Sequence, residues 1–407
     1  MKVLVIGSVY PRFEKDSEVP WLRASVAHLK KAGTEIQILT PSYKGLKSHT
    51  IDGTRVNRFR YATRELEILT HEEGAPSKMA NRPWLQLLAI PYIISGFFKC
   101  IGICRKWRPD VIHAHWPFPH AFIALGASWL FKIPLALNFH GAELLLIRKH
   151  KWVKPALSFA LKHCDAVFAN SSFTAGKIKA IRNVDVEWSP YGTTLGKSTD
   201  RPLPSTANAQ ARSDKFRILF VGRHIERKGI EYLIESSKFL PEEKFEIRIV
   251  GEGDLTEKLK RQAANLDTGE TGKSHCPIIF TGKLSSEELE REYREANVFV
   301  LPAIVDKKGD TEGLGVVLIE ALELSLPVVA TNVGGIPDVI INDETGLLVN
   351  EKDPEALACA FKKLEQDKSL PERLLKGARR RIDECFSWEK IIKKQIEVYN
   401  KIIASKE

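Results

Sequence analysis

The chain alternates short, continuous apolar runs with longer segments of helical periodicity. Runs of this length without internal alternation are typical of strands that are buried on both faces of a parallel sheet. In the first half of the chain, strands are predicted at residues 2–7, 35–40, 111–115, 134–139, 166–170 and 184–189. Helices are predicted in the intervals, among them residues 19–31 and 151–163. This order of elements predicts an α/β fold in which the chain winds on both faces of the sheet.

A second series of the same kind follows a break in the pattern. Residues 192–214 are rich in Gly, Ser, Thr and Pro and lack apolar periodicity, so they are predicted to be a linker. The second set of strands is predicted at residues 216–222, 246–251, 278–281, 297–301 and 327–330. We therefore predict an N-terminal domain at residues 1–191 and a C-terminal domain at 215–387, both doubly wound and Rossmann-like, facing a common cleft.

The last segment, residues 388–405, is predicted to be a helix with Ser387 as its N-cap. Its apolar positions fall on one face: Ile391, Ile392, Ile396, Tyr399 and Ile403. Since the second sheet is already complete at this point, we expect the helix to pack back on the N-terminal domain.

Charge is distributed unevenly between the two halves. Residues 1–190 hold 27 Lys and Arg against 14 Asp and Glu, whereas the remainder holds 34 against 37. A basic N-terminal domain indicates anionic partners such as an anionic membrane or a phosphorylated substrate. No basic cluster is interleaved with aromatic residues, so nucleic acid is not an expected partner. The six cysteines include no Cys-x-x-Cys pair and are interpreted as reduced cytosolic thiols.

Residues 85–104 are the most apolar stretch of the chain. Because Pro91 and Lys99 interrupt the stretch, a helix packed on the N-terminal domain is favoured over a membrane span. A further hypothesis is that this helix lies on an anionic bilayer. The protein is then expected to be cytoplasmic and peripheral on the inner face of the cytoplasmic membrane. Its contacts would be Trp84, Leu85, Leu88, Phe97 and Phe98, with Lys99, Arg105, Lys106 and Arg108. The apolar start of the chain is too short for an export signal.

Two glutamates eight residues apart stand out at residues 310–321. Glu312 is predicted on the loop after the strand at 297–301, where open α/β sheets bind ligands. Glu320 is predicted in the helix that follows. Eight residues span at most about 12 Å of helix, which is comparable with the reach from a ribose to a hexose across a diphosphate. The main-chain N–H groups of Gly313, Leu314 and Gly315 are expected to point at an anion, so the segment predicts a sugar-nucleotide site.

Cations for a diphosphate follow the first strand of the C-terminal domain. Arg223 offers a planar fork and Lys228 a point charge, and Gly222 allows the backbone to approach a ligand closely. Gly251 ends the next strand and offers a second such turn. Neither domain opens with the Gly-x-Gly-x-x-Gly fingerprint of dinucleotide dehydrogenases, and no Walker lysine loop is present.

Histidines gather at strand ends of the N-terminal domain. His113, His115 and His120 are interpreted as packed and hydrogen-bonded residues, with a metal site as the alternative. His140, which precedes a glycine past a buried strand, is expected to point into the cleft beside a ligand. Asp-Thr-Glu at residues 310–312 imitates an Asp-x-Asp metal motif. Because cations are already available for the diphosphate, neither a metal nor another cofactor is expected.

These residues together resemble the retaining glycosyltransferases of the GT-B fold, family 4, over nearly the whole chain. The resemblance rests on His140-Gly141, Gly222-Arg223, Lys228-Gly229, Gly251-Glu252-Gly253, residues 309–321 and Gly334-Gly335-Ile336-Pro337. It implies the donor-binding residues Gly222, Arg223, Lys228, Gly251, Glu312, Gly313, Leu314, Gly315 and Glu320, and the catalytic residues Glu312, His140, Arg223 and Lys228. The first loop departs from the family pattern, because Ser8-Val9-Tyr10-Pro11 stands where many members have a glycine pair.

Each residue has a role implied by the resemblance. Arg223 and Lys228 would bind the donor diphosphate, and Glu320 would bind the ribose hydroxyls. Glu312 would hold the transferred sugar, and His140 would reach that sugar from the N-terminal domain. Transfer would retain the anomeric configuration through an oxocarbenium-like state, with the departing phosphate taking the acceptor proton.

The predicted function is transfer of a hexose from a nucleoside-diphosphate sugar, UDP- or GDP-linked, to a lipid-linked or polysaccharide acceptor. Three alternatives remain open at this stage. A glycosidase or phosphorylase would use Glu312 and Glu320 as an acid and base pair. A sugar-nucleotide epimerase or a catalytically inactive relative that binds nucleotide sugar would share the same fold.

Overall fold

A computed structural model describes residues 1–16, 18–71, 78–79, 82–192, 215–267 and 275–406. The chain forms two compact units, one comprising Met1–Thr194 with Trp388–Glu407 and the other Leu195–Ser387. Apart from Gly192, the linker predicted at residues 192–214 lies outside the described residues. Both units are mixed α/β structures with a mainly parallel sheet, so the predicted fold class is confirmed.

The first unit is built on an eight-stranded sheet in the order β3-β4-β2-β1-β5-β6-β7-β8. Its strands are β1 (Lys2–Ile6), β2 (Glu35–Pro41), β3 (His49–Ile51), β4 (Thr54–Phe59), β5 (Val111–His115), β6 (Leu135–Phe139), β7 (Ala166–Ala169) and β8 (Glu187–Trp188). Its helices are α1 (Pro20–Lys31), η1 (Pro83–Leu88), α3 (Ala89–Trp107), α4 (Pro117–Phe131), α5 (Ala142–Lys149), α6 (Val153–Lys162), α7 (Ser172–Lys179) and α15 (Trp388–Ala404). Only the β3–β4 pairing is antiparallel among these strands.

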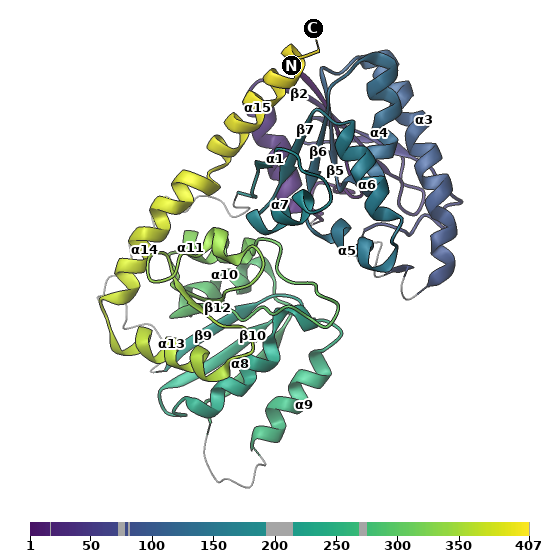
Figure 1. Cartoon of the computed structure of the whole chain (residues 1–407). Coiled ribbons are helices and arrows are strands. Elements are labelled where there is room, and N and C mark those ends of the chain that lie inside the picture. Colours follow the sequence, from purple (N-terminus) through teal and green to yellow (C-terminus); the bar gives the residue numbers. More distant parts are fainter. Residues whose placement is uncertain (17, 72–77, 80–81, 193–214, 268–274, 407) are drawn as a thin grey trace. The chain divides into compact units, whose positions relative to one another are not determined.

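Strand β1 shows how this sheet divides the core into two layers. Val3 and Val5 belong to one apolar cluster, and Leu4 and Ile6 belong to the other. Successive side chains of a strand point to opposite faces, so a continuous apolar run fills both layers. Helices α1 and α15 cover the first layer, while α3, α4 and α6 cover the second (Figure 1).

The hairpin of β3 and β4 was not predicted, for a physical reason. Strand β4 has the sequence Thr-Arg-Val-Asn-Arg-Phe, which lacks a continuous apolar run. Its Arg58 is nevertheless buried, because the guanidinium donates hydrogen bonds to the carbonyl oxygens of Tyr10, Pro11 and Pro41. A buried arginine whose hydrogen bonds are satisfied by backbone oxygens cannot be recognised from hydropathy.

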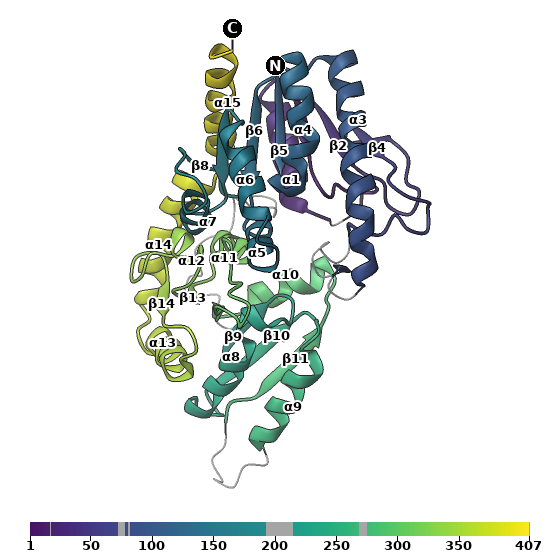
Figure 2. The same ribbon diagram turned by 45° about the vertical axis from the view of Figure 1, so that its right-hand side comes forward.

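The second unit has a six-stranded parallel sheet in the order β11-β10-β9-β12-β13-β14. Its strands are β9 (Phe216–Val221), β10 (Phe245–Val250), β11 (Ile278–Gly282), β12 (Val298–Leu301), β13 (Val328–Thr331) and β14 (Leu347–Val349). Its helices are η3 (Glu226–Lys228), α8 (Ile230–Ser236), η4 (Ser237–Phe239), α9 (Thr256–Asp267), α10 (Ser286–Glu295), α11 (Val316–Glu323), α12 (Ile336–Val339), α13 (Pro354–Gln366), α14 (Leu370–Arg381) and the π-helical η5 (Ile382–Phe386). Figure 2 shows α8 and α9 along one side of β9, β10 and β11.

Helix α15 follows the second unit in sequence but lies on the sheet of the first. Its apolar face is buried at Ile391, Ile392 and Tyr399, and also at Ile402, whereas Ile403 is only partly buried. The Tyr399 hydroxyl lies 2.6 Å from Nδ1 of His113 in β5 and accepts a hydrogen bond of 2.6 Å from Gln395. These contacts join α15 to the centre of the sheet.

Replacing Tyr399 by alanine is expected to destabilise the first unit by about 3–5 kcal/mol, because it removes a fully buried ring and leaves His113 and Gln395 without their shared partner. All eight tryptophans belong to the first unit, so denaturant unfolding followed by tryptophan fluorescence reports on that unit alone. The matched change Lys401→Ala on the exposed face of α15 should alter the free energy of unfolding by less than about 0.5 kcal/mol. Equal effects of the two substitutions would contradict this role of α15.

Candidate active site

In the second unit, three loops after neighbouring parallel strands are packed tightly against one another. Gly229, after β9, has φ +62°, and a Cβ there would lie 1.9 Å from the carbonyl oxygen of Pro302 after β12. Gly251, after β10, has φ +118°, and a Cβ there would lie 2.1 Å from the carbonyl oxygen of Gly222. Only glycine fits at both positions. The close approach that Gly229 and Gly251 allow in the structure is between neighbouring loops. The approach of Gly222 and Gly251 to a ligand stays a prediction.

The loops after β9 and β12 bring Lys228 and Glu312 together. Their Nζ and Oε2 atoms are 2.5 Å apart, and Nη1 of Arg227 lies 3.0 Å from the same Oε2. Both members of the Lys228–Glu312 pair are more than 90% buried. Burial alone would raise the pKa of Glu312, but the charges of Lys228 and Arg227 outweigh it and lower the pKa to about 2. Glu312 is therefore a carboxylate at neutral pH.

The two oxygens of this carboxylate have different surroundings. Oε2 accepts from both cations, whereas Oε1 makes no hydrogen bond within the described part of the chain. Glu312 is also fixed through its backbone, because its carbonyl oxygen accepts a 3.0 Å hydrogen bond from the N–H of Gly335. The site thus presents one oriented carboxylate oxygen for a further donor such as a hydroxyl group.

Arg227 is a site residue that the sequence analysis missed. Besides Glu312, it faces Asp310, with Nε 3.5 Å from Oδ2. Its carbonyl oxygen accepts a hydrogen bond from the N–H of Ile304, which ties the turn η3 to the loop after β12. The adjacent pair Arg227-Lys228 was the available signal, and only the geometry of η3 determines that both side chains reach the same carboxylate.

Arg223 lies close enough to Lys228 for their charges to interact, and Glu320 lies on α11 beside Tyr293. Arg223 is exposed, and its side chain makes no hydrogen bond or ion pair within the described residues. Burial lowers the pKa of Lys228, as does the charge of Arg223, while Glu312 opposes the shift. Glu320 is half-buried in the second turn of α11. The pKa of Tyr293 is raised mainly by the burial of its own hydroxyl and further by the negative charge of Glu320.

The segment at residues 313–315 leads directly into α11. Gly315 is the N-cap of the helix and has no side chain to accept from the first-turn N–H groups. Gly313 is half-buried and Leu314 is buried. The N-terminus of α11 thus retains the polarity that favours an anion.

In the first unit, His140 follows β6 and is enclosed by aromatic side chains. Its Nε2 lies 3.0 Å from Nδ1 of His115, and its Nδ1 lies 2.5 Å from the hydroxyl of Tyr191. The rings of Trp21 and Trp116 each lie 4.8 Å from the imidazole, centroid to centroid. Both ring nitrogens therefore contact protein groups, in place of the open space expected beside this residue. A direct contact between the imidazole and a ligand requires one of these hydrogen bonds to be replaced.

Two further polar residues lie around His140 that were not among the predicted site residues. Glu143 accepts a 2.8 Å hydrogen bond from the N–H of His140 through Oε1, while its buried Oε2 has no hydrogen-bond partner within the described residues. Burial raises the pKa of Glu143 to about 7. Asn170 donates to the Tyr191 hydroxyl at 3.3 Å. Glu143 could have been recognised from its place in the first turn of a helix after His140, a position that favours carboxylates.

Five buried histidines of the first unit are held in the neutral form. Burial is the main cause that lowers their pKa values, to about 3 for His71, His113 and His140, to about 4 for His120, and well below the usual value for His115. Their folded-state pKa values lie below the value of about 6.5 in unfolded chains. The unfolded chain therefore binds more protons as the pH falls below about 6.5.

The free energy of unfolding of the first unit should consequently be greatest above pH 6.5 and fall between pH 6.5 and 4.5 by more than about 1.4 kcal/mol per pH unit. Denaturant unfolding followed by tryptophan fluorescence at a series of pH values measures this slope. His115→Asn should reduce this slope by up to about 1.4 kcal/mol per pH unit, because the unfolded chain then binds one proton fewer. A flat profile in this window would show that the buried histidines are already protonated in the fold.

Comparison with known proteins shows that both units match models of glycosyltransferase families. The model of "Glycosyltransferase Family 4" matches residues 22–190, and the model of "Glycosyl transferases group 1" matches residues 205–381. These two ranges correspond to the first and second units.

Individual proteins give the same picture. The chain is 25% identical to an uncharacterized glycosyltransferase, MJ1607, of Methanocaldococcus jannaschii, over 98% of both chains. It is 26% identical, over 90% of both chains, to the putative teichuronic acid biosynthesis glycosyltransferase TuaC of Bacillus subtilis. The structure of Anabaena HepE in complex with UDP covers 98% of this chain and 100% of its own, with a TM-score of 0.70 and 16% identity. At that identity the structural likeness establishes the fold.

Proposed function

We propose that this chain, which belongs to the group 1 glycosyltransferases of the GT-B fold, transfers a hexose from a nucleoside-diphosphate sugar to a glycan acceptor with retention of anomeric configuration. The observation that carries the proposal is the buried carboxylate of Glu312, held by Lys228 and Arg227 where two parallel strands of the second unit end. Similarity to TuaC supports an acceptor from polysaccharide or cell-surface glycan synthesis, lipid-linked or polymeric.

The donor diphosphate would be bound by the cations of the second unit. The exposed Arg223 side chain has no hydrogen-bond or ion-pair partner within the described residues, so it can turn to a ligand without breaking an ion pair. Lys228 lies close enough to Arg223 for their charges to interact. Arg223, Lys228 and Arg227 together supply the positive charge that a divalent ion would otherwise provide. We therefore propose a donor site without metal or another cofactor. UDP is the favoured nucleotide, since HepE was solved with UDP, and GDP is the alternative.

Glu312 and Glu320 would each bind one of the two sugars of the donor. The Oε1 atom of Glu312 has no partner within the described residues and can accept from hydroxyls of the transferred hexose. Glu320, one helical turn beyond the start of α11, would accept from the ribose hydroxyls. Main-chain N–H groups at residues 313–315 would add to the phosphate and sugar contacts.

The chemistry would rest on oriented charge and not on a covalent protein intermediate. As the glycosidic bond to the diphosphate breaks, Arg223 and Lys228 would stabilise the negative charge on the leaving phosphate. The Glu312 carboxylate would stabilise the positive charge that develops on the sugar ring. The departing phosphate would take the acceptor proton, and the neutral His140 would provide a hydrogen bond from the first unit.

An acid–base mechanism that uses Glu312 and Glu320 is disfavoured by the site. A general acid must hold its proton near neutral pH, which requires a raised pKa. The pKa of Glu312 is instead lowered to about 2 by its two cations. The carboxylate is thus suited to stabilising charge and unsuited to protonating a leaving group.

The transferase proposal is tested by release of nucleoside diphosphate from a panel of donor sugars with acceptors extracted from cells. Lys228→Gln should lower kcat/KM at least about 100-fold and weaken UDP binding, because it removes a diphosphate contact. Glu312→Gln should lower kcat by a similar factor and leave UDP binding nearly unchanged. Lys376→Gln, on the exposed face of α14, is the matched control. Absence of release from every donor, together with no change in cells that carry Glu312→Ala, would refute the proposal, and an inverted anomeric product would refute retention.

We also propose that α3 docks the protein on an anionic membrane. The segment Pro83–Trp107 is long and apolar enough to cross a membrane, with 28% of its most apolar window buried. One face, including Tyr92, Gly96 and Cys100, packs into the core of the first unit, which favours a helix lying on the bilayer over one that spans it.

The outward face of η1 and α3 carries an apolar stripe formed by Leu87, Ile90, Ile94 and Phe98, each more than half exposed. Leu85, expected to face the bilayer, is fully buried, and Leu88 and Phe97 are partly buried, while Trp84 and Phe98 are exposed as predicted. The segment at residues 83–108 has no acidic residue, and its basic residues Lys99, Arg105, Lys106 and Arg108 are exposed. This combination suits anionic lipid.

Leu87→Gln/Phe98→Gln should reduce sedimentation with vesicles of phosphatidylglycerol and phosphatidylethanolamine at least about tenfold, since each side chain loses roughly 1.5–3 kcal/mol of burial. Phe239→Gln, an exposed aromatic in the second unit, is the matched control. Weaker binding of the unchanged protein to phosphatidylcholine vesicles is also expected. Identical sedimentation of the double variant and the control would exclude α3 as the docking face.

A further inference from the structure

A basic hollow lies where three neighbouring strands of the first unit end. Arg12 and Phe13 follow β1, residues 43–47 follow β2, and Arg60 and Arg64 follow β4. Strands β1, β2 and β4 are adjacent and parallel, so these three loops emerge at the same edge of the sheet. This is the edge at which open α/β sheets bind ligands.

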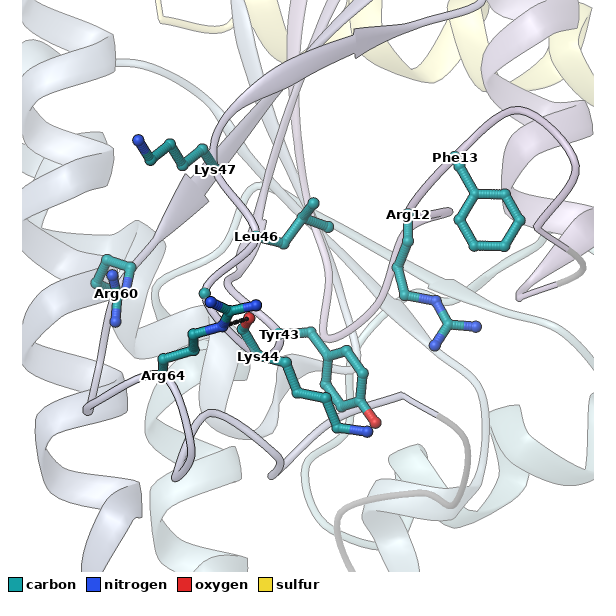
Figure 3. Close-up of a pocket in the computed structure, with 9 residues that line it drawn as sticks. Arg12, Phe13, Tyr43, Lys44, Leu46, Lys47, Arg60 and Arg64 are labelled. Carbon is teal, nitrogen blue, oxygen red and sulfur yellow. Dashed lines mark hydrogen bonds between the residues drawn. The ribbon is translucent and has the colours of Figure 1, made fainter.

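The hollow has a volume of about 620 Å³. Of the described residues that line it, five are cationic and none is acidic: Arg12, Lys44, Lys47, Arg60 and Arg64. Figure 3 shows Arg12 on one side of Tyr43, with Lys44 and Arg64 on the other. Arg12 and Arg60 pair with Asp16 and Glu67, whereas Lys47 and Arg64 make no ion pair within the described residues. Their charge requires compensation by solvent or by a bound anion.

The loop after β2 is held in place by a buried carboxylate. Glu67 is fully buried, accepts hydrogen bonds from the Ser42 hydroxyl at 2.7 Å and from the N–H of Gly45 at 2.9 Å, and pairs with Arg60. Its carbonyl oxygen accepts from the N–H of Lys44 at 2.9 Å. The loop that carries Lys44 and Lys47 is therefore fixed to the segment after β4 before any ligand arrives.

The loop after β1 is fixed by a second buried group. Arg58 donates hydrogen bonds of 3.0 and 2.8 Å to the carbonyl oxygens of Tyr10 and Pro11, directly before Arg12. Asp16 pairs with Arg12 at 2.7 Å and limits the directions that the guanidinium can take. These bonds give this loop a defined conformation despite its departure from the glycine pair of the family pattern.

Tyr43 forms the aromatic part of the hollow. It is buried, and its ring lies 5.5 Å from the guanidinium carbon of Arg12 and 4.9 Å from the ammonium of Lys44. Contacts of cations with the ring hold both side chains near its face. Arg64 donates a 3.1 Å hydrogen bond to the carbonyl oxygen of Lys44, and its guanidinium makes no ion pair within the described residues. Lys47 likewise has no ion pair there.

We propose that this hollow binds the phosphate group of the acceptor, so that the acceptor of the transfer is a phosphorylated molecule. This inference rests on the proposed transferase function. Fixed arginine forks and lysine ammoniums around one hollow match the several oxygens of a phosphomonoester or diphosphate better than a single carboxylate. The hollow shares its sheet edge with His140, which follows β6 in the same parallel sheet.

The hollow also adjoins α3. The hydroxyl of Ser95 in α3 donates a hydrogen bond to the carbonyl oxygen of Arg60, which lines the hollow. Ile94 and Phe98 of the apolar stripe are close to Ser95 in the same helix. A diphosphate on an isoprenoid chain fits this adjacency of cations and apolar surface. A water-soluble sugar phosphate would use the hollow alone.

The test is calorimetric binding of three probes to the full chain in the presence of saturating UDP. Inorganic pyrophosphate tests the bare anion, farnesyl diphosphate tests the lipid-linked source, and glucose 6-phosphate tests the soluble source. At least one probe should bind, and Lys47→Glu/Arg64→Glu should weaken that probe at least about tenfold. The charge-matched control Lys162→Glu/Lys179→Glu, on exposed positions of α6 and α7, should leave the affinity within about twofold.

UDP affinity of each variant shows that the second unit is intact, and tryptophan fluorescence shows that the first unit is folded. If the glutamate variant does not fold, Lys47→Gln/Arg64→Gln replaces it. Lys228→Gln should weaken UDP and leave probe binding unchanged, which separates failure of the donor site from failure of the hollow. Absence of binding by all three probes overturns the inference, as does equal probe affinity in the hollow variant and the control. Preference for farnesyl diphosphate assigns the lipid-linked source, and preference for glucose 6-phosphate the soluble one.

Discussion

Parallel pairing of buried strands is the constraint on which the candidate sites depend. Because neighbouring strands run in one direction, the loops that follow them emerge at one edge of the sheet, however far apart they lie in sequence. In the second unit this brings Lys228, after β9, to Glu312, after β12. In the first unit it gathers the loops that follow β1, β2 and β4 around the basic hollow. The backbone hydrogen bonds between the parallel strands thus determine which loops, and therefore which polar residues, lie next to one another.

Burial has opposite effects around Glu312 and around His140. Glu312 is buried but remains ionised because Lys228 and Arg227 lie against it. The histidines around β5 and β6 are neutral because they are buried without a carboxylate partner, and they contact aromatic rings and hydroxyl groups. A fixed carboxylate with two cations suits an anionic, polar ligand, whereas a neutral aromatic surround suits the apolar face of a sugar.

The sequence predicted much of the fold, and the residues show why. Strands such as β1 and β12 are largely continuous apolar runs, and their positions were predicted within about one residue. The β3–β4 hairpin was missed because Arg58 and Asn57 are polar residues whose burial depends on partners distant in sequence. Hydropathy reports the average preference of a residue and carries no information on such partners.

The candidate site was predictable to a similar depth. Glu312 and Lys228 were recognisable from their places after two strands, and the structure brings them into contact. Arg227 was missed because only the 3₁₀ turn of η3 aims it at the same carboxylate. His140 was expected beside open space, but Tyr191 and His115 occupy both of its nitrogens, and neither contact follows from spacing along the chain. Sequence patterns thus identified backbone positions well and side-chain partners poorly.

The position of helix α15 at the end of the chain affects the order in which the two units can fold during synthesis. The apolar layer on one face of the first sheet includes Tyr399 and Ile402, which are synthesised after every residue of the second unit. Domains usually fold as units while the chain emerges from the ribosome, the N-terminal one first. Here the first unit stays incomplete until the second has emerged, so the second unit can reach its final structure earlier. Until α15 arrives, Val3, Val5 and Phe168 lack a helix that covers them in the complete fold, so this apolar layer is exposed longer than the rest of the core.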